Sequence, residues 1–398
     1  MPGPRLRRTG AAFIAGVALL AGCTPASPAP RDAVDAAAAI PARPSCTAAP
    51  LAERAAAVLV VGIPNVTSAE DELGQSVVDL GVSGLFLSKE NVSSAEQAAA
   101  LVKGLRTRAG RPLLVTTDQE SGRVALAKEL VGVGPAPRRL ARQSTPQEVR
   151  TFAEDIGRGL ADVGINMDFA PVLDLDDGPS RGIIGDRSFS ADPLLAGEYG
   201  LAFSAGLLDA GVTPTLKHFP GQGRSTTDTH TTGDIVDATV EELTDTDLLP
   251  FQRAIDAGAP VVMLNHLGYT ALDGDLPATM SPKTYALLRK MGFKGVAITD
   301  SIGMGSINLR WDFPEAAVRA VEAGADAVLA TDGNQAVRMR DALVAAVGSG
   351  RLPEERLNEA AARVTALAGG DPMAMSCLPI ELPELQAPAP TGTARPTG

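Results

Sequence analysis

Short runs of apolar and β-branched residues recur along the chain, and longer stretches with helical spacing separate many of them. Continuous apolar runs of this length are typical of strands that are buried on both faces. We expect eight strands, at 58–63, 84–88, 113–118, 166–171, 213–220, 261–266, 296–300 and 327–331. Helices are expected at 95–108, 146–163, 193–210, 314–323 and 352–368, and a Ser144-Thr145 cap is expected before the second of them.

This alternation predicts an α/β protein, and eight such strands favour a (β/α)8, TIM-like barrel that forms a single catalytic domain. An open doubly wound sheet is the alternative, although no glycine-rich dinucleotide turn follows the first run. In a barrel, the functional side chains stand at the carboxyl ends of the strands. Five runs end there in polar or titratable residues, namely Asp118, Lys217-His218, Asn265-His266, Asp300 and Thr331-Asp332.

The amino-terminal segment resembles a bacterial lipoprotein leader. Three arginines precede an apolar stretch at 10–20, which is too short to cross a bilayer. The small residues Ala21 and Gly22 then lead directly to Cys23, as at a lipoprotein cleavage site. We expect residues 1–22 to be a signal peptide and Cys23 to carry the lipid that anchors an extracytoplasmic protein to the cell membrane. The alternative is an ordinary secretion signal with an incidental cysteine.

Composition divides the rest of the chain into a tether, one folded domain and a tail. Residues 23–45 are rich in Ala, Pro and Ser without periodicity, and residues 378–398 carry Pro, Thr and Gly in the same way. We expect a flexible tether, a barrel domain at 46–377 and a disordered tail. Cys46 and Cys377 stand at the two ends of that domain, so export favours a disulfide between them over two free thiols.

Charge and composition exclude several classes of protein. The formal net charge is -12 and no basic cluster follows the first few residues, which argues against nucleic-acid binding. Aromatic residues make up only 4%, so sugar recognition would have to use polar side chains. The three histidines, His218, His230 and His266, show none of the spacings typical of zinc ligands. We therefore expect no metal and no cofactor. We also expect a monomer, although no pattern in the sequence decides the oligomeric state.

Two short segments carry candidate chemistry. Asp228 and His230 are two residues apart, and in an extended segment their side chains would point to the same side. The carboxylate could then orient the imidazole for proton transfer, although a polar loop with a fortuitous pair is the alternative. Asp300 ends an apolar run, where it could act as a nucleophile toward a sugar or simply cap the helix that follows.

Five blocks, in this order along the chain, resemble glycoside hydrolase family 3. The resemblance is to its single-domain β-N-acetylglucosaminidases, which act in peptidoglycan turnover, and it extends from about residue 51 to residue 368. The blocks are 118–124 (DQESGRV), 166–174 (NMDFAPVLD), 185–189 (GDRSF), 217–230 (KHFPGQGRSTTDTH) and 295–307 (GVAITDSIGMGSI).

The resemblance implies a role for each matching residue. Asp300 matches the nucleophile that forms a glycosyl-enzyme intermediate, and His230 matches an acid/base that Asp228 orients. Larger relatives take a glutamate acid/base from a second domain, for which we expect no counterpart here. The sugar-binding positions are matched by Asp118, Arg187, Lys217 and His218, and Arg123 lies in the same block as Asp118.

The implied function is a retaining exo-β-N-acetylglucosaminidase that removes terminal β-linked GlcNAc from peptidoglycan fragments, with a small carbohydrate as its substrate. The alternatives are a β-glucosidase-type or phosphorolytic family 3 enzyme, or a non-catalytic lipoprotein that binds wall fragments. One departure falls inside the fourth block. Gln222 replaces the second histidine of the family's usual His-Phe-Pro-Gly-His-Gly segment, which leaves the geometry of that loop open.

Overall fold

The computed structural model describes residues 46–386, and its longer strands are joined in two parallel sheets. The strands of these sheets are β1 (Leu59–Gly62), β2 (Gly84–Phe86), β3 (Leu114–Thr117), β6 (Met167–Asp168), β7 (Thr213–Pro214), β8 (Leu216–Phe219), β10 (Val261–Leu264), β12 (Val296–Thr299) and β13 (Val328–Ala330). The six-stranded sheet has the order β13-β1-β2-β3-β6-β7, and the three-stranded sheet has the order β12-β10-β8. Each neighbouring pair is parallel, which confirms the predicted α/β class.

Every expected run contains a strand, but the run at 213–220 contains two. β7 pairs with β6 in the larger sheet, whereas β8 pairs with β10 in the smaller one. Pro214 has no N–H to donate, but the hydrogen bonds to the segment after β6 continue beyond it, because the N–H of Thr215 donates to the carbonyl of Ala170 at 2.9 Å. Isolated parallel bridges join Val172 to Lys217 and Ile298 to Ala327, where the two sheets adjoin. Closure into a barrel stays a prediction.

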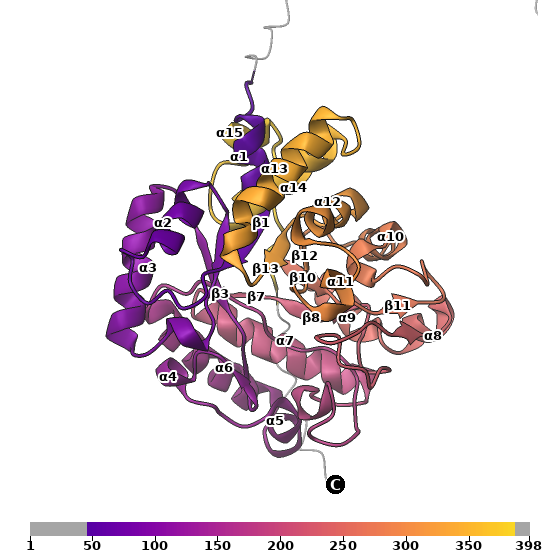
Figure 1. Ribbon diagram of the computed structural model, residues 1–398. Coiled ribbons are helices and arrows are strands. Elements are labelled where there is room, and N and C mark those ends of the chain that lie inside the picture. The colour runs from indigo at the N-terminus through magenta and orange to yellow at the C-terminus, as the bar shows by residue number, and fades with distance from the viewer. Residues whose placement is uncertain (1–45, 387–398) are drawn as a thin grey trace, which may run out of the picture. The chain divides into compact units, whose positions relative to one another are not determined.

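Helices lie around the outside of these strands (Figure 1). The five expected helices are confirmed as α3 (Ala95–Ala109), α6 (Pro146–Asp162), α7 (Pro193–Asp209), α12 (Phe313–Ala323) and α14 (Glu354–Leu367). The other helices are α1 (Leu51–Ala57), α2 (Glu72–Asp79), α4 (Lys128–Val131), α5 (Pro137–Gln143), α8 (Val240–Asp245), α9 (Leu249–Asp256), α10 (Pro282–Lys290), α11 (Gly305–Asn308), α13 (Ala336–Gly348) and α15 (Pro372–Ser376). Two small sheets pair β4 (Gln119–Ser121) with β5 (Val124–Ala125) and β9 (Ile235–Val236) with β11 (Gly268–Tyr269).

Local sequence explains where the helices begin. α6 starts after Thr145, whose hydroxyl accepts the N–H of Glu148 at 3.3 Å, while the Glu148 carboxylate accepts the N–H of Thr145 at 2.7 Å. Pro146 occupies the first turn, where its missing N–H costs no hydrogen bond. The expected cap at 144–145 is therefore confirmed, with Thr145 as the capping residue.

The apolar side chains form two clusters. The smaller cluster draws residues from the strands of both sheets, including Val60, Phe86, Leu114, Met167, Val261, Ile298 and Leu329. The rings of Phe86 and Phe169 stack within it, with centroids 5.8 Å apart. The larger cluster packs the helices against the strands. The strands are thus buried on both faces, as their continuous apolar sequence predicts.

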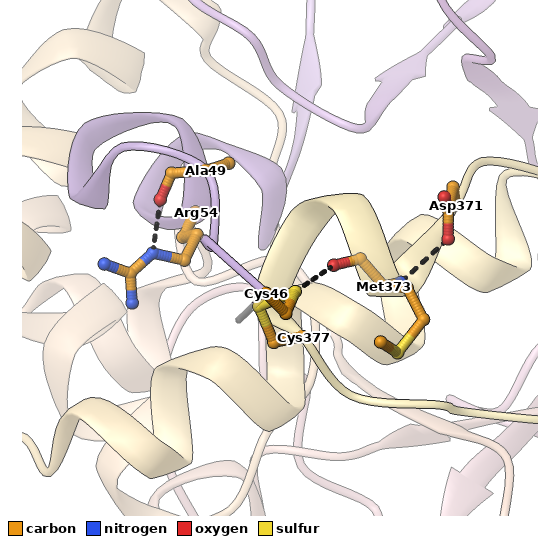
Figure 2. The surroundings of a disulfide bond; sticks show 6 residues. All are labelled: Cys46, Ala49, Arg54, Asp371, Met373 and Cys377. Atoms are coloured by element: carbon orange, nitrogen blue, oxygen red, sulfur yellow. Dashed lines mark hydrogen bonds between the residues drawn. A yellow bond between two sulfur atoms is a disulfide. The ribbon is translucent and has the colours of Figure 1, made fainter. Parts of the chain in front are cut away.

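A disulfide joins Cys46 to Cys377 across a sequence separation of 331 residues. Figure 2 shows the two cysteines together beside Met373 of α15. The adjacent backbone is also paired, because the N–H of Ala49 donates to the carbonyl of Met375 at 3.1 Å. The two ends of the folded domain are therefore tied together, which is the pairing that the sequence favours.

The segment after Cys377 differs from the tail expected there. Residues 378–386 have no regular secondary structure, yet the N–H of Gln386 donates to the carbonyl of Ala257 at 2.7 Å, and Leu385 packs against the core. This part of the expected disordered tail therefore lies against the domain, because its leucines find apolar contacts.

Several expectations fall on parts of the chain outside the described residues. They are the signal peptide at 1–22, the lipidated Cys23, the tether at 23–45 and the end of the tail at 387–398. Within residues 46–386, none of the helices is long and apolar enough to cross a membrane.

Candidate active site

A cavity of about 390 Å³ lies at the carboxyl ends of the strands, where Asp118 follows β3 and Asp300 follows β12. The structure brings together in its lining every residue that the sequence assigns to catalysis or sugar binding. These are Asp118, Arg123, Arg187, Lys217, His218, Asp228, His230 and Asp300.

Four charged side chains form what we call the floor network of this cavity. The Lys217 ammonium donates to the Asp118 carboxylate and lies 2.6 Å from Oε1 of Glu120. The Arg187 guanidinium donates two hydrogen bonds of 2.7 Å to the two oxygens of Glu120. Lys217 and Glu120 are each only 2% exposed. Buried charges persist only when they are paired, so each member of the network holds its neighbour in place.

The pairings in the floor network decide its charge states. Burial opposes ionisation of Glu120, but Arg187 and Lys217 outweigh burial and hold the pKa of this carboxyl well below its usual range. Burial likewise opposes the charge of Lys217, yet Asp118 and Glu120 raise the pKa of the ammonium above its usual value. At Asp118 burial prevails over the attraction of Lys217, so the pKa of this carboxyl is raised. The network therefore offers both donors and acceptors to a polar ligand.

His218 is held by a carboxylate that the sequence analysis did not single out. Its ring Nδ1 donates to Oδ2 of Asp174 at 2.6 Å, and Asp174 is buried. Nε2 of His218 then faces Arg187, whose Nη2 lies 3.4 Å away. Asp174 also accepts the N–H of Gln222 at 2.7 Å, so the backbone of the unusual loop is fixed. The Gln222 side chain lines the cavity, and its Oε1 has no partner among the described residues.

Asp228 and His230 form the expected pair, but in a turn. Oδ1 of Asp228 accepts the ring Nδ1–H of His230 at 2.8 Å and its backbone N–H at 3.0 Å. The carbonyl of Asp228 accepts the N–H groups of Thr231 and Thr232. The expected extended segment is wrong, because a short acidic side chain that bonds the backbone two residues on favours a turn. The hydrogen bonds from His230 lower the pKa of Asp228.

Asp300 directly follows β12, and its carboxylate accepts the N–H of Ser301 at 2.6 Å. Burial would raise the pKa of Asp300, but His266, His218, the Ser301 N–H and Lys217 together keep it below its usual value. The next helix, α11, begins after Met304 without a side-chain cap. The alternative role of Asp300 as a helix cap is therefore wrong.

His266 follows β10 near the expected strand end, but it is not among the residues that line this cavity. Nδ1 lies 2.8 Å from the hydroxyl of Thr279, and Nε2 lies 2.8 Å from the carbonyl of Ser301. Burial lowers the pKa of His266, although the nearby Asp300 opposes this shift. The carbonyl of Ser301 can only accept, so Nε2 of His266 is the donor in that hydrogen bond. His266 thus supports the segment that carries Asp300.

Arg123 lines the cavity, but its guanidinium is bonded to the segment that precedes Arg187. Nη2 donates to the carbonyls of Gly182, Ile183 and Ile184 at 2.6, 2.9 and 2.8 Å. Nε donates to the Asp186 carboxylate at 3.0 Å. These bonds hold the segment that leads into Arg187.

The sequence matches the family profile described as "Glycosyl hydrolase family 3 N terminal domain" over residues 51–367. The chain belongs to glycosyl hydrolase family 3. Beta-hexosaminidase LpqI of Mycobacterium tuberculosis is 34% identical over 328 residues, which are 80% of this chain and 83% of that protein. A solved family 3 member from Mycobacterium smegmatis has a TM-score of 0.75 at 37% identity and is matched over 80% of this chain and 97% of that one.

A solved family 3 beta-N-acetylglucosaminidase from Paenibacillus is similar as well, with a TM-score of 0.76 at 34% identity over 81% of this chain and 62% of that one. The family 3 protein described here is therefore a glycoside hydrolase. In residues 46–386, no group of three or more His, Cys, Asp or Glu side chains is arranged to hold a metal ion.

Sequence reasoning missed two buried carboxylates of this family 3 site, Glu120 and Asp174. Both lie inside blocks that carry the family resemblance, at 118–124 and 166–174. The sequence signal that could have identified these two carboxylates as site residues is their position inside those blocks. Their pairing with Arg187 and His218 depends on contacts between distant parts of the chain.

Proposed function

We propose that this hydrolase is a retaining exo-β-N-acetylglucosaminidase, with Asp300 as nucleophile and His230 as acid/base. The observation that carries the proposal is that Asp300, the Asp228–His230 pair and the floor network line one cavity. A carboxylate and a proton donor facing one sugar are what glycoside hydrolysis requires. The relatives named beta-hexosaminidase and beta-N-acetylglucosaminidase support the choice of sugar.

In the first step, a carboxylate oxygen of Asp300 bonds to the anomeric carbon as the glycosidic C–O bond breaks. Nε2–H of His230 protonates the departing oxygen. The lowered pKa of Asp300 favours the ionised form that this attack needs. Asp228 binds Nδ1 of His230, which leaves Nε2 for the proton transfer.

In the second step, His230 takes a proton from water, and the resulting oxygen nucleophile attacks the anomeric carbon. The bond to Asp300 breaks, and the sugar leaves with its β configuration retained after two inversions. The floor network and His218 hold the sugar through its hydroxyls, because their charged groups form strong directional hydrogen bonds. Arg123 contributes indirectly, by fixing the segment before Arg187.

We further propose that the strands close into a (β/α)8 barrel, at whose mouth this chemistry takes place. Two observations support closure. The bridges Val172–Lys217 and Ile298–Ala327 lie at the two junctions between the sheets. The smaller apolar cluster also draws side chains from both sheets, as the filled interior of a barrel would.

Activity is tested with a chromogenic β-GlcNAc glycoside beside the matching β-glucoside. We expect preferential hydrolysis of the GlcNAc compound, and a loss of at least about a hundredfold in kcat/KM for Asp300→Ala, because covalent catalysis depends on that carboxylate. Trapping with a 2-deoxy-2-fluoro sugar should place the adduct on Asp300 by mass spectrometry. A folded protein inactive on both glycosides, or an adduct elsewhere, would contradict the proposal. Adding phosphate and identifying the product separates hydrolysis from phosphorolysis.

The proposed setting is the outer face of the cell membrane, with peptidoglycan fragments as the natural substrate. The leader at 1–22 and the small residues before Cys23 support this location. If Cys23 is the anchor, the protein should partition into detergent when isolated from its native membranes, and Cys23→Ala should move it to the aqueous phase. Equal partitioning of the two forms would argue for an ordinary secretion signal.

A further inference from the structure

The loop that carries the Asp228–His230 pair, which we call the dyad loop (228–233), is bonded to the segment that follows Asp300. The N–H of Gly305 donates to the carbonyl of His230 at 2.9 Å. The N–H of Ser306 donates to the carbonyl of Thr229 at 3.2 Å. Two backbone hydrogen bonds therefore connect the proposed acid/base to the chain that bears the proposed nucleophile.

The contact requires glycine at position 305. A Cβ added to Gly305 would lie 2.7 Å from the carbonyl oxygen of His230 and 2.8 Å from that of Thr231. Both atoms belong to the backbone, so no side-chain rotation can relieve the overlap, and the dyad loop would have to move. Gly305 is needed here for close approach between two backbone segments.

The two side chains of the proposed dyad are exposed, whereas the residue between them is buried. A second cavity, of about 500 Å³, lies against it and is lined by Thr232, Gly233, Gly305 and Ser306 among others. The side chains of Asp228 and His230 are 47% and 75% exposed, whereas Thr229 between them is only 2% exposed. The two backbone bonds and the buried Thr229 therefore help to hold the loop in this position.

We propose that Gly305 is a positioning residue for proton transfer, because it lets the dyad loop dock where His230 faces the same cavity as Asp300. This inference rests on the proposed acid/base role of His230. Displacing the loop removes the proton donor from the glycosidic oxygen but leaves the floor network and Asp300 in place. The defect should therefore depend on how much the leaving group needs protonation.

The test compares two β-GlcNAc substrates, a disaccharide with a poor leaving group and a dinitrophenyl glycoside with a good one. For Gly305→Ala we expect kcat/KM on the disaccharide to fall at least about tenfold, and on the dinitrophenyl glycoside less than about twofold, since general acid catalysis matters only for the former. Gly274→Ala is the matched control. Gly274 lines the same second cavity, but its added Cβ would meet its nearest atom, Cα of Thr270, at an ordinary 3.5 Å. It should retain activity on both substrates.

Equal losses on the two substrates, or no loss on either, would overturn the role of Gly305. His230→Ala is measured in parallel and should show the same selectivity. If His230→Ala is selective and Gly305→Ala is not, only the present inference is wrong. If His230→Ala affects both substrates alike, the acid/base assignment itself is wrong, and the role of Gly305 falls with it.

Amide hydrogen exchange on the wild-type protein keeps the inference testable if Gly305→Ala does not fold. The amides of Gly305 and Ser306 should be protected, because both donate to the dyad loop. Exchange as fast as in an unbonded surface segment would show that the contact does not persist, and would overturn the proposal.

Discussion

At the scale of single residues, buried carboxylates at or near the strand ends differ in whether a nearby cation compensates for their burial. Glu120 is matched by two cations, whereas Asp168, which lies at the end of β6, is not. Oδ1 of Asp168 accepts the N–H of Gln119 at 2.8 Å, but Oδ2 has no partner among residues 46–386. Burial consequently raises the pKa of Asp168 to about 8, so this carboxyl is mostly protonated at neutral pH.

This raised pKa predicts a pH-dependent effect of Asp168→Asn. A carboxyl whose pKa is higher in the folded state contributes stability below its ordinary value of about 4, and loses that contribution as the pH rises toward 8. Asparagine cannot ionise. The variant should therefore gain stability relative to wild type between pH 5 and pH 8, by up to about 1.4 kcal/mol per pH unit. Urea unfolding at the two pH values measures the change.

Asp177→Asn is a suitable control, because Asp177 is exposed. It should follow the wild-type dependence on pH. A difference between Asp168→Asn and wild type that is the same at pH 5 and pH 8 would mean that Asp168 ionises in the folded protein as it does in the unfolded chain.

At the scale of elements, the sequence was sufficient where one local pattern decides the outcome. The apolar runs and the cap at Thr145 predicted strands and helices that the structure contains. The split of 213–220 into β7 and β8 was not predicted, because it depends on which neighbour each half pairs with. The turn at 228–232 was not predicted either. An aspartate two residues before a histidine is compatible with a strand and with a turn, so the sequence spacing alone does not distinguish the two.

The candidate site shows the same division. Asp118, Lys217 and Asp300 could be predicted from the rule that strand ends carry function, and all three line the cavity. The rule also selected His266, whose ring is instead bonded to Thr279 and Ser301. The direction in which a side chain points depends on its tertiary neighbours, so a position at a strand end does not by itself predict that the side chain enters the site.

At the scale of the whole molecule, the Cys46–Cys377 disulfide closes almost the entire folded domain into one covalent loop. Such a cross-link restricts the unfolded chain, and native disulfides typically contribute about 2–5 kcal/mol. Replacing both cysteines by serine should lower the unfolding free energy by that order. Activity should be unchanged at moderate temperature, because neither cysteine lines the cavity.

Wild-type protein that has been reduced and alkylated serves as the control, and its unfolding curve should shift in the same direction as that of the double variant. Unfolding curves that coincide for wild type, reduced protein and the double variant would show that the bridge contributes nothing to stability. Non-covalent contacts, including the hydrogen bond between Ala49 and Met375 and that between Arg54 and Glu354, would then hold the ends together.

The same bridge determines what a protease can do to this enzyme. A single cut in any surface loop between Cys46 and Cys377 converts the loop into one linear but still covalent molecule, with the two fragments joined through sulfur. The fragments would separate on a gel only after reduction. If the domain is tethered to the membrane through its amino-terminal side, a nicked molecule would remain attached there in both pieces, so damage to a loop would not by itself shed the enzyme from the cell surface.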